Sequence, residues 1–256
     1  MHDILVAMSV MQHGSWEGIY QMLKDKIPVT DEEIRQAYAK LKCSALVLTD
    51  KDYPTAFKEV YRPPLCLFYR GDIGLLNRPR ILGVVGARQA SSYTLDTVAG
   101  LVGKTLEAAS DIVVCSGMAR GVDATAMRQA MARGLPVIGV MGSGINNPYP
   151  ATSRDIYDYC AAGKGLVISE YPCEIEPKRE HFPFRNRLIA TLSHTLLAAQ
   201  VGKRSGTSTT IKCALECGHN IMLIPQRLEE SELTNELVRD GAELACSADD
   251  LVRSFR

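Results

Sequence analysis

Apolar residues recur through the middle of the chain in short unbroken runs, and polar stretches of helical length separate them. The runs cover residues 81 to 85, 112 to 115, 137 to 141, 166 to 168, 195 to 199 and 221 to 224. Short apolar runs bounded by turn residues are typical of strands that are buried on both faces. Buried strands that alternate with helices predict an α/β fold, in which a mostly parallel sheet with right-handed crossovers carries helices on both faces.

The first 80 residues follow a different pattern. Ile34, Ala37, Tyr38 and Leu41 repeat at helical spacing after an acidic start, which indicates short helices. Residues 46 to 80 are rich in proline and hold two short apolar segments, so we expect a connector with two strands that packs against the main domain. The chain is therefore predicted to divide into a short N-terminal helical region, residues 1–45, and one large domain, residues 46–256.

The loops that follow the predicted strands share glycines, hydroxyl side chains and basic side chains. In an open α/β sheet these loops converge at the carboxyl edge, where ligands bind. Glycines allow close backbone approach, and cations attract phosphate, so the sequence predicts a phosphate-binding edge. Tight turns alone would explain Gly86 and Gly142, but they would not explain a basic residue in four of the five loops. The candidate residues are Gly86, Arg88, Ser116, Gly117, Arg120, Gly142, Gly144, Lys203, Arg204, Ser205 and Gly206.

Residues 181 to 191 add an arginine pair to this edge. They read His-Phe-Pro-Phe-Arg-Asn-Arg-Leu-Ile-Ala-Thr, with Arg185 and Arg187 on either side of Asn186. The apolar run after Arg187 can start a helix, whose free N–H groups also attract anions. We expect both guanidiniums to be exposed in the loop and to bind phosphate.

Composition narrows the choice of ligand. The chain has 29 basic and 29 acidic residues, so a polyanion must be held by a local patch of charge. The segment from residue 171 to 205 is net basic and the segment from 226 to 256 is net acidic. Cys213, Cys217 and His219 do not reach the ligand count of a structural zinc site, so we expect no metal and reduced cysteines. Neither a membrane-length apolar run nor a secretion signal is found, which predicts a cytoplasmic protein.

Three familiar classes of site do not match the spacing of the residues. Gly83 and Gly86 lack the third glycine of a dinucleotide fingerprint, and no acid follows the second strand of the main domain to bind a ribose, so we expect no cofactor. The segment from 103 to 105 resembles the end of a phosphate-binding loop, but Val98 stands where that motif needs glycine. The histidines have no obvious nucleophile partner.

Taken together in order, the motifs resemble those of the DprA/Smf family, the DNA-processing proteins of bacterial natural transformation. The resemblance covers about residues 45 to 245. It rests on Gly86-Ala87-Arg88, on the segment from Ser116 to Asp123, on Tyr149-Pro150, Ser169-Glu170-Tyr171 and Phe182-Pro183-x-Arg185-Asn186-Arg187, and on Arg204-Ser205-Gly206-Thr207.

The resemblance implies an extended Rossmann-like domain that binds and protects single-stranded DNA, forms a homodimer, and loads RecA onto strands coated by single-strand-binding protein. It would place Arg88, Ser116, Gly117, Arg120, Arg185, Asn186, Arg187, Lys203 and Arg204 along the DNA groove. The apolar stripe of Leu233, Leu237, Val238 and Leu244 would belong to the dimer or RecA interface, although such a stripe can also be buried against its own domain.

Two departures and one alternative accompany this interpretation. Ala151 stands where the family commonly has lysine, and the sequence ends at Arg256, so no C-terminal winged-helix module is expected.

The alternative is a Rossmann-like enzyme that binds or cleaves nucleotides, which needs a carboxylate after its Gly-Thr motif. Here Ser208, Thr209 and Thr210 follow instead, and Glu170 is the one well-placed acid that remains. We therefore expect a binding protein and not an enzyme.

Overall fold

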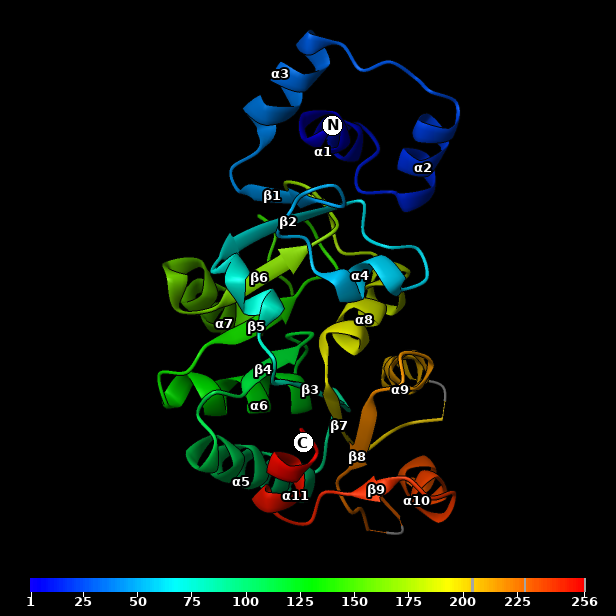
Figure 1. The fold of residues 1–256 in the computed structure, drawn as a ribbon. Helices are drawn as coiled ribbons and strands as arrows, with labels where there is room; N and C mark the ends of the chain where they lie inside the picture. The colour runs from blue at the N-terminus through cyan, green and yellow to red at the C-terminus, as the bar shows by residue number, and fades with distance from the viewer. Residues whose placement is uncertain (204, 228, 256) are drawn as a thin grey trace.

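The computed structural model describes residues 1–203, 205–227 and 229–255, and the strands in this part of the chain form a single nine-stranded sheet (Figure 1). The strands are β1 (Ser44–Val47), β2 (Cys66–Gly71), β3 (Ile81–Gly86), β4 (Val113–Ser116), β5 (Val137–Val140), β6 (Leu166–Ser169), β7 (Thr195–Ala199), β8 (Asn220–Leu223) and β9 (Glu243–Leu244). Their order across the sheet is β1-β2-β6-β5-β4-β3-β7-β8-β9.

All six strands predicted from the apolar runs are present, and they pair in parallel from β6 through β8. This confirms the α/β fold with a mostly parallel sheet. The proline-rich connector does more than pack against this sheet. Its strand β2 pairs antiparallel with β6, with Gly71 opposite Leu166, and β1 pairs antiparallel with β2. The connector therefore extends the sheet by two strands.

Helices cover both faces of the sheet, with α5, α6 and α7 on the left of Figure 1 and α4, α8 and α9 on the right. Successive residues of a strand point to opposite faces. Along β3, Leu82 and Val84 therefore join the core beneath α5 and α6, and Ile81 and Val85 join the core beneath α8 and α9. The helices are α1 (His2–Met11), α2 (Trp16–Lys24), α3 (Asp31–Lys40), α4 (Thr55–Glu59), α5 (Ser92–Ala108), α6 (Val122–Ala132), α7 (Arg154–Tyr159), α8 (His181–Leu192), α9 (Gly206–Glu216), α10 (Glu232–Arg239) and α11 (Ala248–Arg253).

The N-terminal region forms the three short helices α1, α2 and α3. Ser15 and Thr30 begin α2 and α3, since each side-chain oxygen accepts a hydrogen bond from a backbone N–H in the first turn. Helix α1 buries Leu5 and Val6 in the same core as the sheet. The predicted boundary at residue 45 falls inside β1, and the division into two domains stays a prediction. Within the described residues, every helix is too short or too polar to cross a membrane.

The strand order reverses at β3. From β3 the chain winds through β4 and β5 to β6 on one side, and α8 then carries it back to β7 on the other side. The connections that leave β3 and β7 therefore turn to opposite faces, which opens a crevice beyond their carboxyl ends. Ligands of open α/β sheets bind at such a reversal, so the topology alone locates the candidate site.

Candidate nucleic-acid interface

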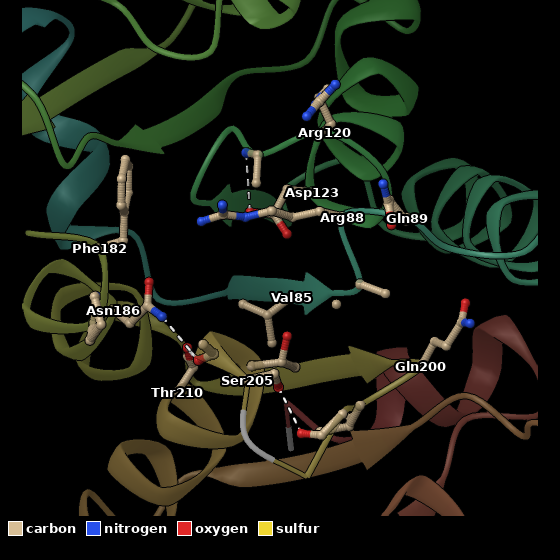
Figure 2. A pocket seen from close by; sticks show the side chains of 18 of the residues that line it. Val85, Arg88, Gln89, Arg120, Asp123, Phe182, Asn186, Gln200, Ser205 and Thr210 are labelled. Atoms are coloured by element: carbon tan, nitrogen blue, oxygen red, sulfur yellow. Dashed lines mark hydrogen bonds between the residues drawn. The ribbon is translucent and has the colours of Figure 1, made fainter. Parts of the chain in front are cut away.

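An open cavity of about 1170 Å³ lies at the carboxyl ends of β3 and β7. Its walls come from the loops after β3, β4 and β7, from the first turns of α8 and α9, and from the start of α10. Figure 2 shows Arg88 and Arg120 on one side of the end of β3 and Ser205 and Thr210 on the other, with Phe182 beside them. The predicted convergence of these loops at one edge of the sheet is thus present in the structure.

Basic side chains line the rim of this cavity. Arg88 and Arg120, two of the predicted site residues, are exposed, and Arg179 is exposed on the loop before α8. The guanidinium carbon of Arg88 lies 5.4 Å from the centroid of the Phe182 ring, a cation–π contact that orients the arginine. Lys203 also lines the cavity, and its Nζ lies 3.0 Å from Oε1 of Glu236. The rim can therefore attract phosphates although the chain as a whole carries no net charge.

The N-terminus of α9 supplies backbone donors to the same cavity. Ser205 caps this helix, since its Oγ accepts a hydrogen bond from the N–H of Ser208. In return, the Oγ of Ser208 accepts a hydrogen bond from the N–H of Ser205. Asn186 reaches across from α8 and donates from Nδ2 to the carbonyl of Gly206 at 3.0 Å. These contacts fix the first turn of α9 against the cavity, and a helix N-terminus held in this way favours anions.

Arg185 lies in the interior wall of the cavity and not in an exposed loop. It is 5% exposed and donates from Nη1 to the carbonyls of Gly117, at 3.0 Å, and Val140. Asp123 is equally buried and accepts the N–H groups of Gly117 and Ala119. Burial raises the pKa of Asp123 to about 6, against the opposing effect of Arg185. Burial also lowers the pKa of Arg185 to about 10.

Arg187 likewise differs from the expected exposed phosphate ligand. Helix α8 begins at His181, before both arginines, and Arg187 points to the end of β6. Its Nη1 and Nη2 each donate to one carboxylate oxygen of Glu170 at 2.6 Å, and both side chains are 6% exposed. The structure therefore places Arg187 in a buried bidentate ion pair outside the cavity. Its partner, Glu170, stands 17 positions away in the sequence.

Three further predicted site residues lie outside the cavity for reasons of packing. Ser116 is fully buried, and its hydroxyl donates to the carbonyl of Val84 at 2.5 Å between β4 and β3. A Cβ on Gly142 would lie 2.9 Å from the Phe182 ring, and a Cβ on Gly144 would lie 2.3 Å from a backbone nitrogen. These two glycines allow close packing of neighbouring segments. Gly117 also lies outside the lining and serves as an acceptor for Arg185, whereas Gly86 does line the cavity.

Sequence reasoning did not identify several polar residues of the cavity. Gln89 and Gln200 follow β3 and β7, Thr210 lies one turn into α9, and Glu230 precedes α10. Position was the available signal for Gln89 and Gln200, because both stand within four residues of a predicted strand end. Arg204, predicted from the same loop as Lys203, lies outside the described residues.

The apolar stripe near the C-terminus divides between two environments. Leu233, Leu237 and Val238 lie on α10 and pack, partly buried, against the core beneath α8 and α9. Leu244 lies on the edge strand β9 and is 37% exposed. The packing of α10 accounts for much of the stripe within one chain, and the predicted dimer or RecA interface stays a prediction.

The carboxylate required by the enzymatic alternative is already engaged. Glu170 was the candidate, and Arg187 occupies both of its oxygens. Among the residues that the structure describes, His, Cys, Asp and Glu side chains form no group of three that could share a metal ion.

Comparison with known proteins gives matches over most of the chain. The family model for DNA recombination-mediator protein A matches residues 44–256. DNA processing protein DprA of Streptococcus pneumoniae is 32% identical over 229 residues, which cover 89% of this chain and 79% of that protein. The Bacillus subtilis protein of the same name is 31% identical over 217 residues, which cover 84% of this chain and 72% of that protein.

Solved structures agree with the sequence matches. The crystal structure of the S. pneumoniae protein superimposes with a TM-score of 0.80 at 30% identity and covers 94% of this chain and 81% of its own. The structure of DNA processing protein A from Helicobacter pylori, described for its single-stranded DNA binding mode, gives a TM-score of 0.73 at 27% identity. It covers 83% of this chain and 96% of its own.

Proposed function

Because the chain belongs to the DNA recombination-mediator protein A family, we propose that it binds single-stranded DNA in the cavity between β3 and β7 and acts there as a recombination mediator. The observation that carries this proposal is the position of the cavity. Exposed arginines and the N-terminus of α9 meet at the reversal of strand order, where this fold binds ligands. The single-stranded DNA binding described for the H. pylori relative supports it.

We assign the phosphate contacts to Arg88, Arg120, Lys203 and the first turn of α9, and we give Arg185 and Asn186 a supporting role. Arg185 holds the loop after β4 and Asn186 holds α9, so both shape the cavity without offering free charge to the solvent. Backbone phosphates are common to every sequence, so binding through these groups has little base preference. Phe182 and the exposed Tyr149, whose ring centroids are 5.8 Å apart, offer faces for stacking at one side.

The finer steps of the proposal concern assembly. We propose that the protein protects incoming single strands in the cytoplasm and loads RecA onto strands coated by single-strand-binding protein, as the family resemblance implies. We further propose a homodimer that uses the exposed Leu244 and the outer side of α10, with the acidic C-terminal segment open to RecA. We propose binding and not catalysis, since Glu170 is held by Arg187.

Fluorescence anisotropy with a labelled oligothymidylate tests the binding site. Arg88→Ala should weaken binding and reduce the slope of log affinity against log salt by about 0.7, the value for one phosphate contact on a single strand. Arg35→Ala is the matched control, because Arg35 is an exposed arginine on α3 far along the chain from the cavity loops. Affinity that ignores salt, or equal losses in the two variants, would exclude this cavity as the binding site. A nucleotide-hydrolysis assay on the same preparation tests the enzymatic alternative.

A further inference from the structure

Four planar side chains form a stack on the surface of the N-terminal region. The rings of Trp16 and Tyr20, one turn apart on α2, are nearly parallel, with centroids 4.9 Å apart and an interplanar angle of 13°. The guanidinium carbon of Arg62 lies 5.3 Å from the Trp16 ring centroid and 5.3 Å from the Tyr61 ring centroid. We call Tyr61, Arg62, Trp16 and Tyr20 the aromatic ladder.

Two contacts anchor the inner members of the ladder, and its two outer rings are exposed to solvent. Trp16 donates from Nε1 to the carbonyl of Pro63 at 2.8 Å, and Arg62 pairs with Glu17. The outer members remain in solvent, since Tyr20 is 50% exposed and Tyr61 is 75% exposed. A preformed stack with an exposed ring at each end can therefore accept another planar group at little conformational cost.

A continuous series of contacts links the ladder to the cavity. Helix α8 lines the cavity through Phe182, and its first residue, His181, stacks on Tyr171 with ring centroids 3.9 Å apart. Tyr171 follows β6 and packs against Gly14, two residues before Trp16; a Cβ on Gly14 would lie 3.0 Å from the Tyr171 Cα.

The sheet sets the approximate separation of the two sites. Strand β6 stands three places from β3 in the sheet, which amounts to about 14 Å at about 4.8 Å per strand. The ladder thus lies beyond β6, along the same edge of the sheet as the cavity.

We propose that the ladder is a second contact for single-stranded DNA, where bases of the strand that leaves the cavity stack on Tyr61 and Tyr20. This inference rests on the proposed function. Stacking on aromatic rings tolerates any sequence, since every base has a π-face, and a guanidinium within the stack adds cation–π attraction. Trp16 and Tyr20 lie outside residues 44–256, the segment that the family model matches, whereas Tyr61 and Arg62 lie inside it.

The composition of the ladder is also typical of protein interfaces, where Trp, Tyr and Arg dominate the binding energy. Its position favours DNA, because a strand bound in the cavity needs an exit along the sheet edge. The experiment must separate the two occupants, and the chain offers a direct probe. Trp16 is the one tryptophan in the sequence, so its emission reports on the ladder alone.

The test compares oligothymidylates of about 6 and about 16 nucleotides, within the range of site sizes of single-strand grooves. Anisotropy of a label on the oligonucleotide reports binding anywhere on the protein, and Trp16 emission reports stacking at the ladder. We expect the long oligonucleotide to quench Trp16 emission at saturation and the short one to bind with little change in emission.

Tyr61→Ala should weaken binding of the long oligonucleotide by about 5- to 140-fold, which is the effect of losing one base stack worth about 1–3 kcal/mol. Binding of the short oligonucleotide should not change. Tyr38→Ala is the matched control, because Tyr38 is a 41% exposed tyrosine on α3 that takes no part in the ladder.

Two results would overturn the inference, and they differ from each other. If the long oligonucleotide binds but leaves Trp16 emission unchanged and Tyr61→Ala binds as the wild type does, DNA does not occupy the ladder, and a protein partner becomes the occupant to seek. If neither oligonucleotide binds, the proposed function itself fails and the inference falls with it.

Discussion

Replacing Arg187 with alanine should destabilise the protein without removing any of the phosphate contacts proposed for the cavity. The substitution removes two hydrogen bonds of 2.6 Å to Glu170 and two more to the carbonyls of Phe184 and Arg62. It also leaves the Glu170 carboxylate buried without its cation. Breaking a buried pair in this way costs about 3–5 kcal/mol, and no discount for solvent applies because both side chains are 6% exposed. For a chain of this size the melting temperature should fall by about 6–20 °C.

Calorimetry or urea unfolding measures this effect, and two further variants make it interpretable. Arg88→Ala removes an exposed arginine and should change the free energy of unfolding by at most about 0.5 kcal/mol. The double variant Glu170→Ala with Arg187→Ala should be less destabilised than the sum of its single variants, because the unpaired charge is gone. An Arg187→Ala protein that melts like the wild type but binds DNA weakly would refute this reasoning and restore Arg187 as a phosphate ligand.

Three other outcomes follow from the geometry. Asp123 is ionised above its raised pKa of about 6 and neutral below it, so DNA affinity should rise as the pH falls from 7 to 5. Asp123→Asn should reduce that rise in anisotropy titrations. The contribution of Asp123 to the free energy of unfolding should fall as the pH rises from about 4 through 6. Ser116→Ala should cost about 1 kcal/mol in urea unfolding through the lost hydrogen bond to Val84, while DNA affinity stays at the wild-type value. Leu244→Arg should give a folded monomer by light scattering, because Leu244 is exposed on β9 and belongs to the proposed dimer interface; a wild-type monomer at tens of micromolar would contradict that interface.

The strands of the parallel sheet could be predicted because each one carries its own signal. A run such as residues 195 to 199 is apolar after its first residue, Thr195, which suits a strand covered by helices on both faces, and β7 matches that range residue for residue. The antiparallel pairing of β2 with β6 could not be predicted. It joins segments about 100 residues apart, and nothing local to either strand records the partner.

The exposed residues of the site could be predicted for a related reason. Arg88 and Arg120 stand in the loops that follow β3 and β4, so topology alone brings them to the cavity. The roles of Arg185 and Arg187 depend on partners elsewhere in the chain, Gly117 with Val140 for one and Glu170 for the other. A sequence shows that an arginine is present but not whether a distant carboxylate or carbonyl already binds it.

The pairing of β3 with β7 also governs when the protein becomes functional during its synthesis. Leu82 lies opposite Thr195, so one edge of β3 has no partner until about 110 further residues have been translated. At about 5–20 residues per second this takes roughly 6–22 s, during which unpaired N–H and C=O groups in the middle of the future sheet are open to association with other chains. The cavity cannot be complete on a shorter nascent chain, because the loop after β7 and the start of α9 form part of its wall. A ribosome that stalls between these strands would therefore display an aggregation-prone edge and an incomplete cavity.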